Sequence, residues 1–178
     1  MLDRHVALIG FMAAGKSTIG RHLARELDVP FIDTDELIVA QNGPVPALFE
    51  RAGESGFRAA EYEAVRSALQ GPVGVVALGG GAVTYEPTRK LLAERALRIY
   101  LDISVDTLVL RLRRSPTIRP VVGTAPTEAR VRELLSAREP FYREAEIIVT
   151  GPRRTKMTFV REILDRIDEY KRSSQSVS

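Results

Sequence analysis

Short apolar runs alternate along the chain with longer stretches in which apolar residues recur every three or four positions. The runs cover residues 6–9, 73–78, 99–101 and 147–149, and most are rich in β-branched residues. Unbroken apolar runs of this length are typical of strands buried in a parallel sheet. A shorter apolar pair, Phe31 and Ile32, is interpreted as one more strand, which leads into Asp33.

The longer stretches have the spacing of amphipathic helices. Ile19, Leu23 and Leu27 recur every four residues before Pro30 closes the pattern. Similar patterns predict helices over 37–69 with breaks at 42–46 and 53–56, over 105–112 behind the candidate N-cap Ser104, from about 127 to before Pro140, and over 157–167. Strands that alternate with helices predict an α/β domain with a parallel central sheet, and binding sites then lie at the carboxyl ends of its strands.

Residues 115–126 interrupt this alternation with three prolines and one glycine. An ordered loop of this length is typical of a lid or a binding loop. We therefore expect a mobile lid at about 113–126. The chain has no internal repeat and no interdomain linker, so we expect one domain over residues 1–172 and a disordered tail over 173–178.

Composition narrows the class of protein. Of 178 residues, 44% are apolar and 28% are charged, which suits one packed core and excludes a disordered or fibrous chain. No apolar run approaches the roughly 20 residues that span a bilayer, and Asp3, Arg4 and His5 lie where a signal peptide would be apolar. Without cysteine there is no disulfide framework or thiolate metal site, and two histidines are too few for a histidine-rich one. We expect a soluble, cytoplasmic protein.

The basic residues are concentrated in two places. The 26 lysines and arginines exceed the 23 acidic residues by only three. The larger cluster contains no acid and holds Arg111, Arg113, Arg114 and Arg119, and the smaller one holds Arg153 and Arg154. Such clusters either meet a visiting anion or are solvated loop charges.

Residues 10–17 read G-F-M-A-A-G-K-S and match the phosphate-loop pattern G-x-x-x-x-G-K-[ST] in full. The pattern lies between a predicted strand and a predicted helix, where glycines let backbone N–H groups turn toward phosphate oxygens. Lys16 would reach the β and γ phosphates and the Ser17 hydroxyl would bind Mg²⁺. The predicted nucleotide-binding residues of the loop are Gly10, Ala13, Ala14, Gly15, Lys16, Ser17 and Thr18.

The order of motifs along the chain resembles the shikimate kinases. Residues 31–38 read F-I-D-T-D-E-L-I, residues 53–61 contain G-E-x-x-F-R-x-x-E, and residues 78–83 read L-G-G-G-A-V. The similarity continues through Arg119 and Arg138 and runs from about residue 5 to residue 170. It implies a three-layer P-loop kinase fold, a substrate-binding segment at about 34–62, and transfer of the γ-phosphoryl group of Mg·ATP to the 3-hydroxyl of shikimate, on the route to chorismate and the aromatic amino acids.

The resemblance also implies roles on the substrate side. Arg58 and Arg138 resemble the arginines that bind the carboxylate, and planar guanidinium groups suit that grip. Glu61 would orient Arg58, or merely form an i,i+3 pair with it. Asp35 resembles the acid that contacts the hydroxyls and accepts the proton of the attacking one, although it also suits a helix N-cap. The strand-end glycines that allow close approach of the substrate, or merely form a turn, are Gly79, Gly80 and Gly81.

On the nucleotide side, the resemblance implies that Asp33 holds Mg²⁺ through water. Arg119 resembles a lid arginine that joins Lys16 and Mg²⁺ in placing positive charge on the transferring group. The family continues that lid motif as R-P-L-L, whereas residues 119–122 here read R-P-V-V. For the arginine beside adenine, Arg114 is our choice within the basic cluster, and Arg153 is a second candidate.

Three rival interpretations stay open. A gluconate kinase would share the loop and the fold, and a kinase for quinate or aminoshikimate would share nearly every motif. A nucleotide-dependent module that binds nucleic acid is the third, but an aromatic content of 6% without tryptophan offers few stacking platforms. We expect a monomer whose partners are small molecules, not nucleic acid or membrane.

Overall fold

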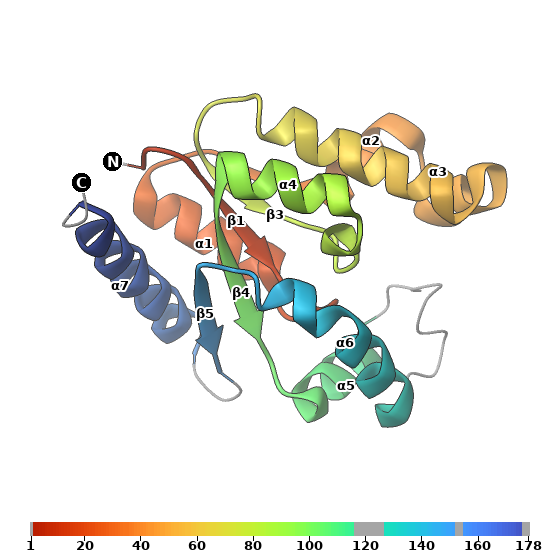
Figure 1. Ribbon diagram of the computed structural model, residues 1–178. Helices are drawn as coiled ribbons and strands as arrows, with labels where there is room; N and C mark the ends of the chain where they lie inside the picture. The colour runs from red at the N-terminus through yellow and green to blue at the C-terminus, as the bar shows by residue number, and fades with distance from the viewer. Residues whose placement is uncertain (1, 116–126, 152–154, 176–178) are drawn as a thin grey trace.

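The computed structural model describes residues 2–115, 127–151 and 155–175 (Figure 1). Its centre is a five-stranded parallel sheet in the order β2-β3-β1-β4-β5. The strands are β1 (His5–Ile9), β2 (Phe31–Asp33), β3 (Val75–Ala77), β4 (Ala96–Asp102) and β5 (Ile147–Thr150). The predicted α/β architecture with a parallel central sheet is therefore confirmed.

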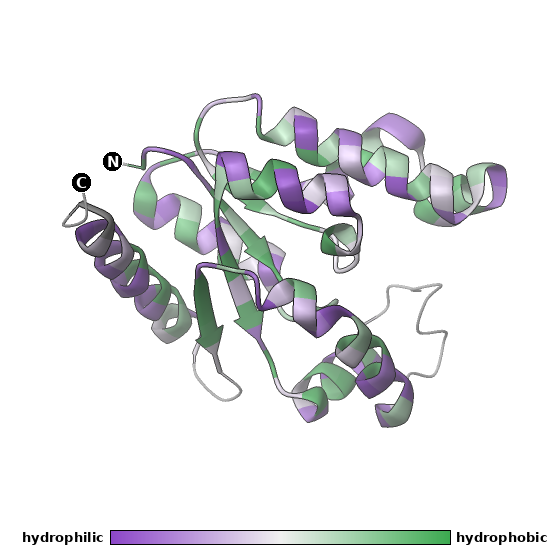
Figure 2. Ribbon diagram, viewed as in Figure 1, coloured by the Kyte–Doolittle hydropathy of each residue, from purple (hydrophilic) through white to green (hydrophobic). Residues whose placement is uncertain are grey.

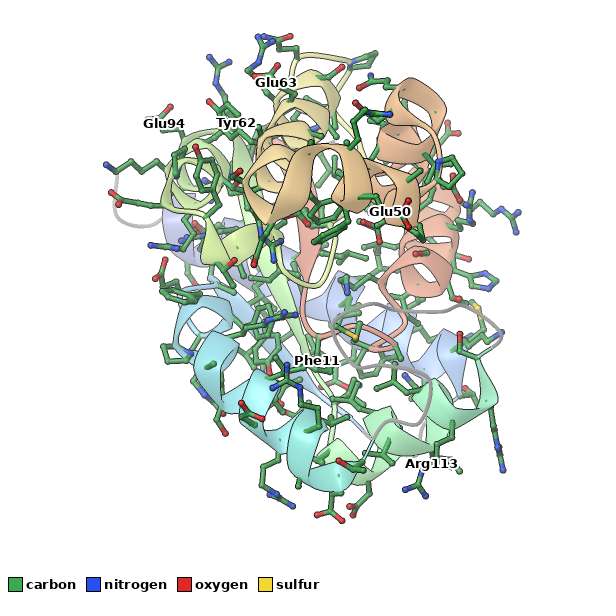
Figure 3. All side chains as sticks on the ribbon, turned by 90° about the vertical axis from the view of Figure 1, so that its right-hand side faces the viewer. Phe11, Glu50, Tyr62, Glu63, Glu94 and Arg113 are labelled. Carbon is green, nitrogen blue, oxygen red and sulfur yellow. The ribbon has the colours of Figure 1, made fainter. Side chains whose placement is uncertain are left out.

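Helices cover both faces of this sheet. They are α1 (Lys16–Leu27), α2 (Thr34–Asn42), α3 (Val45–Ala68), α4 (Glu86–Arg95), α5 (Val105–Arg114), α6 (Glu128–Tyr142) and α7 (Lys156–Gln175), with a short 3₁₀ turn η1 (Ala82–Thr84). Helices α4 and α6 lie on one side of the strands and α1 and α7 on the other, as the two perpendicular views show (Figures 1 and 3). The predicted three layers are present.

The core explains why the strand sequences are almost wholly apolar. Each residue of β1 is buried, because this strand lies between β3 and β4 and is covered from both faces. The helices contribute one apolar stripe each, for example through the fully buried Leu23, Leu92 and Ile163. Green hydrophobic bands accordingly turn inward and purple ones outward (Figure 2). Among the described residues, no helix is both long and apolar enough to cross a bilayer.

Several predicted boundaries differ from the structure. Helix α6 includes Pro140 and ends two residues later, so the predicted end before Pro140 is wrong. Burial of Tyr142, which is 0% exposed, outweighs the backbone hydrogen bond that proline cannot donate. Helix α4 was not predicted, since only Thr88 and Leu92 of its ten residues are buried. Helix α7 continues to Gln175, into the expected tail.

Two helix boundaries that local sequence signals predicted are present in the structure. The Ser104 hydroxyl accepts a hydrogen bond from the Thr107 N–H, so the predicted N-cap of α5 is confirmed. The predicted break near residue 53 is confirmed too. Gly53 has φ 65° and ψ −170°, which interrupts α3 between two helical halves.

Candidate functional site

The phosphate loop joins β1 to α1 at the carboxyl edge of the sheet. Gly10 has φ 141° and Gly15 has φ 104°, values that side chains disfavour. A methyl group on Gly10 would also lie 2.9 Å from the Leu101 carbonyl oxygen. The glycines of the motif are therefore required by the turn itself, and the loop has the predicted strand before it and helix after it.

Lys16 lies over the centre of this loop. Its Nζ donates hydrogen bonds to the carbonyl oxygens of Gly10 and Phe11, each at 2.9 Å, and the residue is only 8% exposed. These contacts fix the ammonium group against the backbone of the loop. An anion that binds the loop therefore meets a fixed positive charge.

A pocket of about 460 Å³ opens at this loop. It brings together many of the predicted residues, namely Ala13, Ala14, Gly15, Lys16, Ser17, Thr18, Asp35 and Gly80. The first six belong to the phosphate loop and the start of α1, whereas the last two follow strands β2 and β3. Of the predicted substrate-side residues, Asp35 and Gly80 thus line the same cavity as the phosphate loop, at the carboxyl ends of the strands. The others are not part of this lining, namely Arg58, Glu61, Gly79, Gly81 and Arg138.

Two acids lie where β2 ends and α2 begins, and they have different surroundings. Asp33 is the N-cap of α2, because its Oδ1 accepts a hydrogen bond from the Asp35 N–H at 3.0 Å. The N-cap alternative considered for Asp35 is therefore wrong. Asp35 lies in the first turn of α2 and lines the pocket, and this leaves its carboxylate beside the phosphate loop.

Arg58 and Glu61 form a close ion pair on α3. The Arg58 NH1 atom lies 2.6 Å from Glu61 Oε2, and Glu61 is 2% exposed. Burial raises the pKa of the Glu61 carboxyl, and the neighbouring Arg58 charge opposes that rise. Glu54 approaches the other terminal nitrogen of Arg58 at 3.6 Å. The i,i+3 pair is present, and it fixes where the Arg58 guanidinium lies.

The glycine run after β3 packs against these charged side chains. A methyl group on Gly79 would lie 2.5 Å from Glu61 Oε1 and 2.8 Å from Asp35 Oδ1. One on Gly81 would lie 2.6 Å from Arg58 NH1. The absence of side chains thus lets two carboxylates and a guanidinium gather around one loop.

Arg138 reaches the same loop from α6. It is 7% exposed, its NH1 donates to the Gly80 carbonyl oxygen at 3.2 Å, and its guanidinium lies 5.7 Å from the centre of the Phe11 ring. Phe11 itself lies near the middle of the molecule (Figure 3). Two arginines from different helices therefore lie against the glycine loop, and each planar guanidinium can bind a carboxylate through two N–H groups.

The basic cluster of α5 contributes a different arginine from the one we chose. Arg111 lines the pocket and donates to the Ala13 and Ala14 carbonyl oxygens at 3.1 and 2.9 Å, whereas Arg114 is exposed and is not part of the lining. Arg113 extends from the surface (Figure 3). Arg119 and Arg153 lie outside the described residues.

Comparison with known proteins matches the sequence of this chain to one family. A family model for shikimate kinase matches residues 12–168. A shikimate kinase of Nitrobacter winogradskyi is 44% identical over 85% of this chain and 71% of its own length, and one of Pseudomonas fluorescens is 42% identical over 92% and 96%. The chain belongs to the shikimate kinase family.

Solved structures agree with this assignment. A shikimate kinase from Acinetobacter baumannii, solved in complex with shikimate, has a TM-score of 0.89 and 35% identity over 94% of each chain. A gluconokinase from Sinorhizobium meliloti has a TM-score of 0.65 at 17% identity. The second likeness shows a shared fold alone, so the resemblance seen in the motifs is confirmed for shikimate kinases and not for gluconate kinases.

Sequence reasoning missed the far end of the pocket. Lys156 and Phe159 line it from the first turn of α7 and Thr155 from just before that helix, while Gly151 follows β5 and Ile103 follows β4. One signal was present, because Thr155 caps α7 by accepting a hydrogen bond from the Thr158 N–H at 3.2 Å. The position of this helix beside the phosphate loop depends on sheet order, which local patterns do not contain.

The protein oxygen atoms near the phosphate loop suit a Mg²⁺ ion that also binds water and nucleotide phosphates. The Ser17 hydroxyl lines the pocket, and the Asp33 carboxylate is buried at the end of β2. No group of three or more acidic, histidine or cysteine side chains that could hold a metal occurs in the described part of the chain. Mg²⁺ prefers oxygen ligands and keeps several waters, so a hydroxyl, a carboxylate and nucleotide phosphates suit it without an all-protein cage.

Proposed function

We propose that the protein transfers the γ-phosphoryl group of ATP to the 3-hydroxyl of shikimate, giving shikimate 3-phosphate and ADP. One observation carries the proposal: Lys16 and Ser17 of the phosphate loop line the same pocket as Asp35 and Gly80 of the substrate half. Phosphoryl transfer needs little covalent help from a protein, so this juxtaposition of donor and acceptor sites is its main requirement.

On the acceptor side, we assign the shikimate carboxylate to Arg58 and Arg138. Both are largely buried, and each is already held by an internal partner, Glu61 for the first and the Gly80 carbonyl for the second. Because the guanidinium groups are fixed before substrate arrives, less conformational freedom is lost on binding. The shikimate bound to the Acinetobacter relative supports this assignment of substrate.

Asp35 is our proposed acceptor for the hydroxyl proton. It lines the pocket beside the phosphate loop and packs near Gly79 and Glu61. A carboxylate there orients the attacking hydroxyl and takes its proton as the new bond to phosphorus forms.

On the donor side, Lys16 neutralises charge on the phosphates, and Arg119 of the proposed lid at about 113–126 adds to it. Ser17 and, through water, Asp33 would hold Mg²⁺. When bound, Mg²⁺ supplies charge neutralisation at the β and γ oxygens. We add Arg111, which lines the pocket with the start of α7, as a candidate for the arginine beside adenine, and the choice of Arg114 stays a prediction. Arg153 remains a candidate there.

The wider organisation follows as part of the same proposal. Residues 1–172 form one kinase domain in which about 34–62 binds substrate. The cytoplasmic location and monomeric state stay predictions, and light scattering coupled to size-exclusion chromatography measures the second.

The deciding experiment is ADP release from Mg·ATP with shikimate, quinate, aminoshikimate or gluconate, each beside a control without acceptor. We expect strong stimulation by shikimate alone. Stimulation by another acid instead would retain the kinase and overturn the substrate. No stimulation by any acid, together with salt-sensitive binding of nucleic acid, would favour the binding-module alternative.

A further inference from the structure

In the glycine loop after β3, formed by residues 79–81, the carbonyl groups and one of the three N–H groups are hydrogen-bonded. The Gly79 N–H donates to the Thr34 hydroxyl at 3.1 Å, and the Gly79 and Gly81 carbonyls accept from the N–H groups of Ala82 and Thr84. The N–H groups of Gly80 and Gly81 have no hydrogen-bond partner among residues 2–115, 127–151 and 155–175. The Gly80 N–H belongs to a residue that lines the pocket, whereas Gly81 is buried and outside that lining, so a bound molecule reaches Gly80 most directly.

The remaining carbonyl, that of Gly80, is held by two side chains of α6. Arg138 donates to it at 3.2 Å, and the Tyr142 hydroxyl donates to it as well. Tyr142 is fully buried, and its ring stacks on Tyr100 with centroids 5.1 Å apart and an interplanar angle of 22°. This packing fixes where the hydroxyl lies.

The Tyr142 hydroxyl stays protonated and so remains a hydrogen-bond donor. Burial raises the pKa of its hydroxyl to about 12. The group therefore keeps its proton throughout the pH range in which kinases are assayed, and its hydrogen bond to the Gly80 carbonyl persists.

Peptide geometry connects this hydrogen bond to the free donors. The Gly80 C=O and the Gly81 N–H belong to one planar trans peptide, so they point in opposite directions. Glycine has wide freedom in φ and ψ, and an unsupported glycine run would sample many orientations. A side chain that holds the Gly80 carbonyl therefore also sets the direction of the Gly81 N–H.

We propose that Tyr142 and Thr34 are positioning residues for shikimate, which hold the glycine loop from two sides so that its free N–H groups and Arg138 meet the substrate. The inference rests on the proposed function, because Gly80 and Arg138 form a site only if shikimate binds there. The proposal includes no contact between the substrate and Tyr142 or Thr34, since both are fully buried.

Loss of the Tyr142 hydroxyl has two consequences for that site. The Gly80–Gly81 peptide loses one of the two donors that orient it. Arg138 becomes the remaining donor to the Gly80 carbonyl, which competes with its contact to a substrate carboxylate. Both effects weaken binding of shikimate. Neither removes a hydrogen bond of the phosphate loop, although Gly80 packs against Met12 of that loop.

The test compares Tyr142→Phe with Tyr100→Phe. Both variants keep the stacked ring pair, but the Tyr100 hydroxyl donates to Asp102 at 3.4 Å and not to the glycine loop. We measure KM for shikimate and for ATP, kcat, the Kd of shikimate by calorimetry, and the thermal midpoint. One lost hydrogen bond corresponds to a roughly three- to tenfold rise in KM and Kd for shikimate in Tyr142→Phe. The ATP KM of both variants and the shikimate KM of Tyr100→Phe should stay at the wild-type value.

A second pair of variants tests the contact of Thr34 and includes a conservative substitution as a control for misfolding. Thr34→Val removes the acceptor of the Gly79 N–H, whereas Thr34→Ser retains it. We expect Thr34→Val to raise the KM for shikimate and Thr34→Ser to restore it.

The outcomes separate the two proposals. A wild-type protein that shikimate does not stimulate overturns the proposed function. A shikimate-stimulated wild type with an unchanged Tyr142→Phe KM, or with equal rises in both KM values, overturns the positioning role alone. A lower thermal midpoint without a change in the Kd of shikimate would leave Tyr142 a purely structural residue and likewise overturn it.

Discussion

A single methyl group added at Gly79 tests whether the charged cluster is as tightly packed as the structure shows. In Gly79→Ala the new carbon would lie 2.5 Å from Glu61 Oε1 and 2.8 Å from Asp35 Oδ1, both far inside contact distance. Gly79 does not have a positive φ, so backbone strain adds nothing and the cost is steric. Overpacking of this kind costs about 1–3 kcal/mol.

That cost should appear in both stability and activity, because the groups displaced are the proposed proton acceptor and the partner of Arg58. If the whole cost falls on the transition state, 1–3 kcal/mol corresponds to a decrease in kcat/KM of roughly 5- to 150-fold for shikimate. Binding of ATP alone should change little, since the phosphate loop does not contact the new methyl group.

Gly71→Ala is the matched control. Gly71 is exposed, and the nearest atom to an added methyl group would be the Ala68 carbonyl oxygen at 3.7 Å, an ordinary contact. This variant should be neutral or more stable by about 0.4–1 kcal/mol, because alanine restricts the unfolded chain. Urea unfolding and steady-state kinetics of both variants give the comparison. If Gly79→Ala matched Gly71→Ala in both assays, the carboxylates would be free to move aside, and the argument from close packing would be refuted.

Three other changes probe separate parts of the molecule. Lys16→Met removes the charge held over the phosphate loop and should lower kcat at least about 100-fold with native circular dichroism; near-normal turnover would refute the loop assignment. Arg111→Ala should raise the KM for ATP more than Arg114→Ala does, since Arg111 alone of the two lines the pocket, and equal effects would contradict this. Burial lowers the pKa of His5 below 6.5, so the stability contributed by its neutral ring is present above pH 6.5 and is lost as the pH falls through the lower folded value. Urea unfolding at about pH 7.5 and about pH 5 should show a larger loss for wild type than for His5→Gln, and identical losses would disprove it.

The parts of the fold that sequence predicts well are those with strong local patterns. Strand β1 and the phosphate loop were recognisable because an unbroken apolar run ends in a glycine motif whose φ values only glycine tolerates. The end of helix α6 was predicted too early, before Pro140, because the helix is held there by burial of Tyr142 against Tyr100. These two tyrosines are 42 residues apart in the chain. A local window contains no trace of that partner.

The arginines of α5 show how far a local sequence pattern can identify residues of the site. Counting back from Arg119 does not determine which arginine of α5 lines the pocket. The buried residues Leu108, Val109 and Leu112 define the inner face of α5. Arg111 follows Leu108 by three positions and Arg113 follows Val109 by four, so both border that face, whereas Arg114 lies opposite it. The amphipathic pattern therefore separates Arg114 from the other two arginines but does not choose between Arg111 and Arg113.

Several of the contacts that escaped prediction are made to backbone atoms. Arg111 holds the carbonyls of Ala13 and Ala14, Tyr142 holds that of Gly80, and Thr34 holds the N–H of Gly79. Motifs record side chains whose own chemistry binds phosphate, carboxylate or metal, and so they lead to Lys16, Asp35 and Arg58. A carbonyl or an N–H belongs to every position, so its partner can be any donor or acceptor that the topology brings near. In this site the sequence pattern therefore leads to the side chains that we propose meet substrate, and three-dimensional structure is needed to find the groups that hold the backbone in place.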